Sequence, residues 1–147
     1  MIIAVFYYFK HLRGRMRKML NENIFKAYDI RGVYPDEVNE EVIEEVGKVL
    51  PSRIGKECVV IGYDIRKGSK ELAGALKRVL EKSGVKQVIE IGLSTTPMFY
   101  FLVNKLNADG GVMITASHNP PEFNGCKIVE KNAIPISGTD ILKLVKK

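Results

Sequence analysis

The pattern that most constrains this fold is the alternation of short apolar runs with longer amphipathic segments. Apolar runs of strand length lie at 58–61, 85–91 and 111–114, and segments of helical periodicity separate them. Such alternation is typical of an α/β layer structure in which neighbouring strands are parallel and helices cover the sheet. We predict three such strands, a return strand over 127–129, and a short helix over 140–147. The crossover connections between parallel strands should be right-handed.

Three of the expected helices begin at residues with capping chemistry. Asn39 precedes a glutamate-rich first turn, where the carboxylates suit the helix dipole and form a solvated face. Ser69 is expected to cap the second helix, which Gly84 would end. Thr96 is expected to cap the third, because Pro97 fits the first helical position.

Positive charge is concentrated at the start of the chain. Residues 1–20 contain five basic and no acidic side chains, whereas the remainder contains 18 basic and 17 acidic ones. The body is therefore nearly neutral, and the net charge of +6 says little about its partners. The apolar run 1–9 is too short to span a bilayer, which takes about 20 residues.

Two interpretations of this leader remain open. Residues 1–20 are either a membrane-surface or nucleic-acid-binding arm, or a poorly ordered extension of a domain that covers residues 21–147. We favour the extension, because a single basic tract is a weak signal. We accordingly expect neither nucleic acid nor a membrane among the partners.

Length and cysteine content limit which classes of protein this chain can belong to. A chain of 147 residues suits one compact domain, and 46% hydrophobic with 27% charged residues is ordinary for a globular protein. Cys58 and Cys126 have no metal-binding spacing. We expect Cys58 to be buried in a strand and both thiols to be free, which fits the reducing cytoplasm.

A loop with reactive side chains follows the apolar run 111–114. Thr115–Lys127 has the sequence Thr-Ala-Ser-His-Asn-Pro-Pro-Glu-Phe-Asn-Gly-Cys-Lys. Its Asn119-Pro120 and Asn124-Gly125 pairs form turns, so the loop should have a fixed shape. It carries a serine, a histidine and a lysine just beyond the carboxyl end of a strand, where open α/β sheets place ligand chemistry.

This stretch resembles the active-site serine loop of the α-D-phosphohexomutases, the phosphoglucomutase and phosphomannomutase family. A second segment, Tyr28-Asp29-Ile30-Arg31-Gly32, resembles another motif of that family. The resemblance runs from about Asn23 to the end of the chain and covers the first of the family's four domains. It implies a three-layer α/β/α domain with a mixed, mostly parallel sheet flanked by helices.

The resemblance also implies a role for each site residue. Ser117 would carry a phosphoryl group and pass it to a hexose phosphate, so that phosphate moves between the 1 and 6 positions through a bisphosphate. Phosphoserine brings a charge of about −1.5 to −2, which cations must balance. Arg31 and Lys127 are the expected catalytic and phosphate-binding cations. Tyr28 and Asn119 are the other expected phosphate-binding residues, although Asn119 also suits a loop-shaping role.

His118 has two open roles. It could orient Ser117 or assist proton movement, or it could satisfy backbone groups of the loop. A Ser-His-Asp hydrolase is the chemical alternative, but the serine and histidine are adjacent and no Gly-x-Ser-x-Gly elbow surrounds the serine. Asp64 and Arg66 resemble a further family element, which would brace the active-site loops through an ion pair.

The implied cofactors are Mg²⁺ and a hexose bisphosphate activator. The family holds Mg²⁺ between the serine phosphate and three aspartates of its second domain, so this chain would supply only the phosphate on Ser117. Alone, the chain should be nearly inactive. The other domains would either come from a partner chain or be absent because the chain is a fragment. The alternative is a stand-alone sugar-phosphate-binding or interaction domain without turnover.

Overall fold

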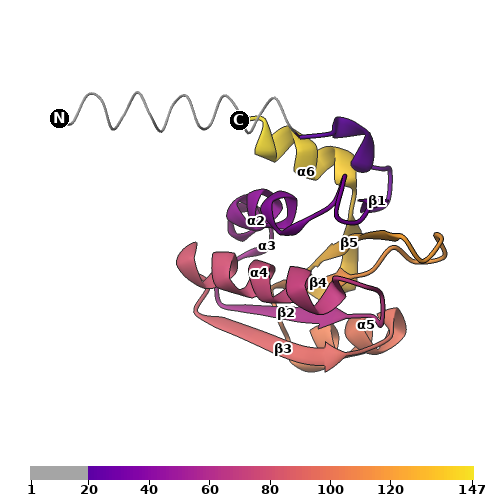
Figure 1. The fold of residues 1–147 in the computed structure, drawn as a ribbon. Coiled ribbons are helices and arrows are strands. Elements are labelled where there is room, and N and C mark those ends of the chain that lie inside the picture. Colours follow the sequence, from indigo (N-terminus) through magenta and orange to yellow (C-terminus); the bar gives the residue numbers. More distant parts are fainter. Residues whose placement is uncertain (1–19) are drawn as a thin grey trace.

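The computed structural model describes residues 20–147, which form a mixed sheet with helices on both sides (Figure 1). The strands are β1 (Ile30–Val33), β2 (Cys58–Tyr63), β3 (Gln87–Leu93), β4 (Gly110–Ile114), β5 (Phe123–Glu130) and β6 (Ile134–Ile136). The helices are α2 (Glu40–Val49), α3 (Pro51–Ile54), α4 (Ser69–Lys82), α5 (Thr96–Lys105) and α6 (Gly138–Val145), with short 3-10 turns η1 (Glu22–Ile24) and η2 (Lys131–Ala133). The expectation for residues 1–19 lies outside the described residues.

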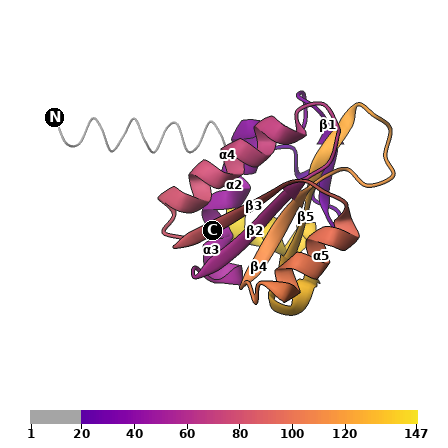
Figure 2. The same ribbon diagram turned by 90° about the horizontal axis from the view of Figure 1, so that it is seen from below.

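The helices form two outer layers around the sheet, as the family resemblance implied. Figure 2 shows α2 and α4 on one side of the sheet and α5 on the other. The larger hydrophobic core includes Leu76 of α4 and Ile114 of β4, whereas a smaller core includes Phe99 of α5 and Met113 of β4. Successive residues of β4 therefore face different helical layers, which is the alternation that a strand imposes.

The sheet is mixed, as expected, but it has more antiparallel pairing than a mostly parallel sheet would. The strand order is β1-β5-β4-β2-β3, with β6 also paired with β5. β2 is parallel to β3 and β4, whereas β5 is antiparallel to β1, β4 and β6. The prediction of three strands and one return strand was wrong, because it omitted β1 and β6. Both are short and contain glycine or proline, so their sequences carry a weak strand signal.

One predicted cap is confirmed and another is displaced by a tertiary contact. Asn39 Oδ1 accepts a hydrogen bond from Val42 N at 3.1 Å and caps α2. Ser69, in contrast, is the first residue of α4 and follows Gly68, so the prediction that it caps the helix was wrong. Its hydroxyl instead donates to Asp64 Oδ1 at 2.7 Å, in the loop after β2.

The cap of α5 is shifted by one residue. Thr95 Oγ1 accepts from Met98 N at 3.4 Å, and Thr96 is already helical, so the expectation for Thr96 was wrong. Two adjacent threonines offer the same hydroxyl, and propensity does not distinguish them. The C-terminal helix is confirmed, with Ser137 as its cap.

Both cysteines are free thiols, as expected. Cys126 on β5 is buried, and this burial, together with the nearby Asp29 carboxylate, raises the pKa of its thiol to about 12. Cys58 at the start of β2 is only half-buried, so the expectation of full burial was wrong. Burial and the charge of Asp109 still raise its pKa. Neither thiol is therefore an activated nucleophile at neutral pH.

Two helical glycines provide a matched test of the packing between α2 and α4. A Cβ at Gly47 would collide with Val79 of α4, whereas a Cβ at Gly74 would meet only Arg78 Nη1 at 3.5 Å. We expect Gly47→Ala to lower the free energy of unfolding by about 1–3 kcal/mol through overpacking. Gly74→Ala should raise it by up to about 1 kcal/mol, because alanine favours the helix. Urea denaturation measures both values, and a neutral Gly47→Ala would contradict the close packing.

Candidate functional site

The serine loop connects two antiparallel neighbours of the sheet. β4 ends at Ile114 and β5 begins at Phe123, and Figure 1 shows the intervening segment as an orange loop that projects beyond the sheet. Thr115 N donates to Gly125 O at 2.9 Å, which extends the β4–β5 ladder by one step. The loop therefore begins from a fixed position at the carboxyl end of β4.

Ser117 lies at the bend of this loop in a strained backbone conformation. Its φ of 56° falls in the left-handed region, which residues other than glycine seldom occupy outside constrained sites. Its N–H donates to Thr115 Oγ1 at 2.9 Å, and its carbonyl accepts from Arg66 at 2.8 Å. Its half-buried side chain places Oγ 3.2 Å from His118 Nδ1. The backbone of Ser117 is thus fixed on both sides.

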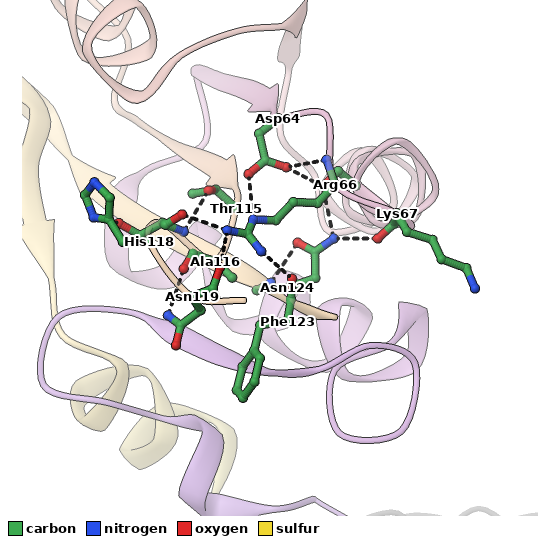
Figure 3. Close-up of polar contacts among 12 residues, drawn as sticks. Asp64, Arg66, Lys67, Thr115, Ala116, His118, Asn119, Phe123 and Asn124 are labelled. Carbon is green, nitrogen blue, oxygen red and sulfur yellow. Dashed lines mark hydrogen bonds and ion pairs between the residues drawn. The ribbon is translucent and has the colours of Figure 1, made fainter. Parts of the chain in front are cut away.

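Arg66 holds the loop from the segment that follows β2, and Figure 3 shows its guanidinium between Asp64 and the loop. The guanidinium donates to four loop carbonyls, those of Ser117 (2.8 Å), Asn119 (2.7 Å), Pro120 (2.7 Å) and Phe123 (3.1 Å). Arg66 Nε also lies 3.3 Å from Asp64 Oδ2. The structure therefore contains the ion pair expected to brace the loops, and it adds four direct bonds to the loop backbone.

The same network reaches the start of α4. Asp64 Oδ1 accepts from Ser69 Oγ at 2.7 Å and from Arg66 N at 3.0 Å. The buried Asn124 side chain donates from Nδ2 to Lys67 O and to Ser69 Oγ, both at 3.0 Å. The prediction that Asn124 and Gly125 form a turn was wrong, because both residues lie in β5. The Asn124 side chain instead ties the start of β5 to the loop after β2.

A buried carboxylate brings Arg31 and Lys127 together. Asp29 is 5% exposed; its Oδ1 lies 3.2 Å from Arg31 Nε and its Oδ2 lies 3.3 Å from Lys127 Nζ. The β1–β5 register explains this arrangement. Ile30 pairs with Cys126, so one further antiparallel step places Asp29 opposite Lys127, and Arg31 follows Asp29 on the same face.

Asp29 is a site residue that the sequence pattern did not reveal. It belongs to the segment Tyr28–Gly32 that resembles a family motif, but no role was predicted for it. The spacing of Asp29 and Arg31 does contain a signal, because residues two apart on a strand share a face. The pairing with Lys127 had no such signal, since it depends on a strand that lies about a hundred residues further along the chain.

The other expected site residues differ in their placement. Asn119 Nδ2 donates to Ala116 O at 2.8 Å, which shapes the loop, and Asn119 also lines a surface depression with Arg31. Tyr28 is 79% exposed and makes no hydrogen bond with any described residue. The exposed ring of His118 forms a hydrogen bond with the serine hydroxyl and none with a carboxylate of residues 20–147, so no Ser-His-Asp triad is formed in that part of the chain.

The described residues do not form a metal site by themselves. Among residues 20–147, no three His, Cys, Asp or Glu side chains lie close enough to hold a metal ion. The two carboxylates beside the site arginines are both engaged, Asp29 by Arg31 and Lys127 and Asp64 by Arg66. Mg²⁺ prefers several oxygen ligands in octahedral geometry, which this set does not offer.

Comparison with known proteins decides the family. The family model for "Phosphoglucomutase/phosphomannomutase, alpha/beta/alpha domain I" matches residues 22–147. The chain belongs to this phosphoglucomutase/phosphomannomutase family. A "Phosphohexose mutases" protein of Xanthomonas campestris pv. campestris is 49% identical to this mutase-family chain over 113 residues, which cover 77% of this chain and 25% of that protein. A "Phosphomannomutase" of Salmonella montevideo is 41% identical over 129 residues, which cover 88% and 28% respectively.

A solved structure supports the same assignment. The crystal structure of a phosphoglucomutase/phosphomannomutase family protein from Burkholderia thailandensis superposes with a TM-score of 0.77 and 35% sequence identity. The superposition covers 87% of this chain and 30% of the Burkholderia protein. The mutase-family chain spans about a quarter of the length of the curated relatives named above. The resemblance and the α/β/α fold predicted from the sequence are thereby confirmed.

The role of Arg66 in this mutase-family loop can be tested by Arg66→Lys. A lysine has one donor nitrogen and cannot bond four carbonyls and Asp64 together. We expect the free energy of unfolding to fall by about 2–4 kcal/mol, because exposed or partly buried loop carbonyls lose four charge-assisted bonds together. Amide hydrogen exchange should accelerate at Asn119 and Phe123, whose N–H groups bond within the loop. Arg78→Lys, on the exposed side of α4, is the matched control, and wild-type exchange in Arg66→Lys would refute the brace.

Proposed function

We propose that this chain is the phosphoserine-bearing domain of a phosphohexomutase, with Ser117 as the residue that carries the phosphoryl group. The observation that carries the proposal is the presentation of Ser117, whose backbone is fixed on both sides at the bend of a braced loop. The names of the relatives support the reaction class, since they are called phosphohexose mutase and phosphomannomutase. The proposed substrate is therefore a hexose phosphate.

In the proposed reaction, a hydroxyl oxygen of the hexose phosphate attacks the phosphorus of phosphorylated Ser117. The bond between phosphorus and Ser117 Oγ breaks, a hexose bisphosphate forms, and the hydroxyl proton ends on Oγ. His118 Nδ1 lies 3.2 Å from that oxygen, which supports a role for this residue in carrying the proton. The bisphosphate then returns its other phosphoryl group to the serine, so that phosphate moves between positions 1 and 6 of the sugar.

Arg31 and Lys127 are the proposed cations for the transferring group. Phosphoryl transfer spreads negative charge over the phosphate oxygens, so fixed cations stabilise the transition state. Arg31 uses Nε towards Asp29, and its terminal nitrogens make no hydrogen bond with residues 20–147. The Lys127 ammonium has three protons and bonds only Asp29 within the same residues. Both side chains therefore retain donors for phosphate.

Several parts of the proposal extend beyond this chain's own geometry. Mg²⁺ would take the phosphate on Ser117 as a ligand, but the described residues alone do not fit the ion. Three further points stay predictions. They are the hexose bisphosphate activator, the role of Tyr28 and Asn119 in phosphate binding, and a second chain with the other mutase domains.

Within residues 20–147, no helix has the length and apolar character needed to cross a bilayer. A cytoplasmic location remains a prediction.

Phosphorylation of Ser117 is the direct test of the proposed function. The purified chain is incubated for many hours with glucose 1,6-bisphosphate and Mg²⁺, because a single phosphorylation of the serine does not need the turnover that the chain alone should lack. Tryptic peptides are then analysed by mass spectrometry. We expect one phosphoryl group on Ser117, absent from Ser117→Ala and retained in the control Ser94→Ala. Lys127→Ala should label at least about tenfold more slowly, because it removes one transition-state cation. An unmodified Ser117 would instead favour a sugar-phosphate-binding domain without turnover.

A further inference from the structure

Asp29 is buried at the centre of the proposed phosphate site, although its charge has the wrong sign for an anion. One carboxylate oxygen faces Arg31 of β1 and the other faces Lys127 of β5. We propose that Asp29 is a positioning residue that holds these two cations as one preformed clamp for a phosphate group. This inference rests on the proposed function of the same site and names the residue that prepares it.

The burial of Asp29 shows that its orientation depends on the two cations. Its side chain is 6% exposed, and Oδ2 accepts a hydrogen bond from Lys127 Nζ at 3.3 Å. Oδ1 is buried and accepts no hydrogen bond of regular geometry from the described residues, so the ion pair with Arg31 Nε at 3.2 Å is its compensation. A buried carboxylate needs such partners, because an uncompensated buried charge is strongly unfavourable.

The positions of the two cations depend in turn on Asp29. Arg31 and Lys127 come from different strands, and their like charges would separate them if the carboxylate between them were absent. Both side chains are long and lose rotamer freedom when they bind a ligand. Asp29 removes that freedom in advance, which is the general advantage of a preorganised site.

The contact with Asp29 leaves other hydrogen-bond donors of both cations available for phosphate. Arg31 is engaged through Nε, the inner edge of its guanidinium, so the two terminal nitrogens remain for the fork-like binding of phosphate oxygens. Arg31 also lines the surface depression that Asn119 of the serine loop borders. The Arg31 side of the clamp therefore faces a depression that the serine loop borders through Asn119.

The charge of Asp29 makes this proposal easy to distinguish from a simple counter-ion role. If Asp29 only neutralised charge, its removal would leave the site more positive and would strengthen the binding of an anion. If Asp29 positions the cations, its removal weakens anion binding despite the more favourable net charge. The two roles thus predict opposite signs for one measurement.

Asp29→Asn is the decisive variant, because it preserves the side-chain size but turns one acceptor into an amide donor. That donor would face Arg31 or Lys127, so one of the two contacts must be lost. The matched control is Asp36→Asn, which removes the same charge from an exposed turn. The probe is inorganic phosphate, titrated into each ¹⁵N-labelled protein at constant pH and ionic strength and followed by NMR.

The expected result is phosphate binding about tenfold weaker in Asp29→Asn, since one oriented charge-assisted bond is worth on that order. Asp36→Asn should bind phosphate as the wild type does. Equal or tighter binding by Asp29→Asn, or no phosphate binding to Arg31 and Lys127 in the wild type, would overturn the proposal. Phosphorylation of wild-type Ser117 is measured separately, so a failure of the positioning role is distinguishable from a failure of the proposed function.

A second measurement decides the matter if Asp29→Asn does not fold. In the wild-type chain, hydrogen exchange of the Arg31 Nε–H is compared with that of Arg78, which is exposed on α4. A proton held against Asp29 should exchange more slowly than the Arg78 proton. Equal exchange rates would show that Asp29 does not hold Arg31 in place, and the proposal would be wrong.

Discussion

The site depends on one arginine that crosses from the loop after β2 to the serine loop. Arg66 donates hydrogen bonds to four carbonyls that would otherwise be hydrated in a projecting loop. Its guanidinium is held in place by an ion pair with Asp64. A loop of this length has many conformations, so its single shape needs such a constraint. The left-handed backbone of Ser117 persists because the bonds on either side of it determine its conformation.

A second constraint acts on charge, and it comes from the sheet itself. The antiparallel register of β1 and β5 brings Asp29, Arg31 and Lys127 to one face, so two cations and one carboxylate are assembled by backbone pairing. The serine loop leaves the sheet from the strand next to β5. The loop and the cations are therefore positioned by different interactions. The Arg66 network positions the loop that carries the Ser117 hydroxyl, and the strand register positions Arg31 and Lys127.

Much of this architecture was predictable from local sequence. The strands β2, β3 and β4 are clear from their apolar runs, and the Asn119-Pro120 pair indicates the loop. The turn predicted at Asn124-Gly125 was wrong, because both residues pair with β1 as part of β5. The aromatic and β-branched residues of Ile24–Tyr34 predict an extended segment, and β1 lies within it. Neither β1 nor β6 was counted as a strand of the sheet, because their pairing with β5 cannot be predicted from their own residues. For the same reason the ion pair of Asp29 with Lys127 and the side-chain contacts of Asn124 were not predicted, since the partners are distant in sequence.

The most direct test is a crystal structure of the chain with phosphoserine installed at position 117. Our account predicts phosphate oxygens within hydrogen-bond distance of a terminal nitrogen of Arg31 and of Lys127 Nζ. It also predicts that the four carbonyl bonds of Arg66 are retained. A phosphate directed into solvent, with both cations still bound to Asp29 alone, would contradict it.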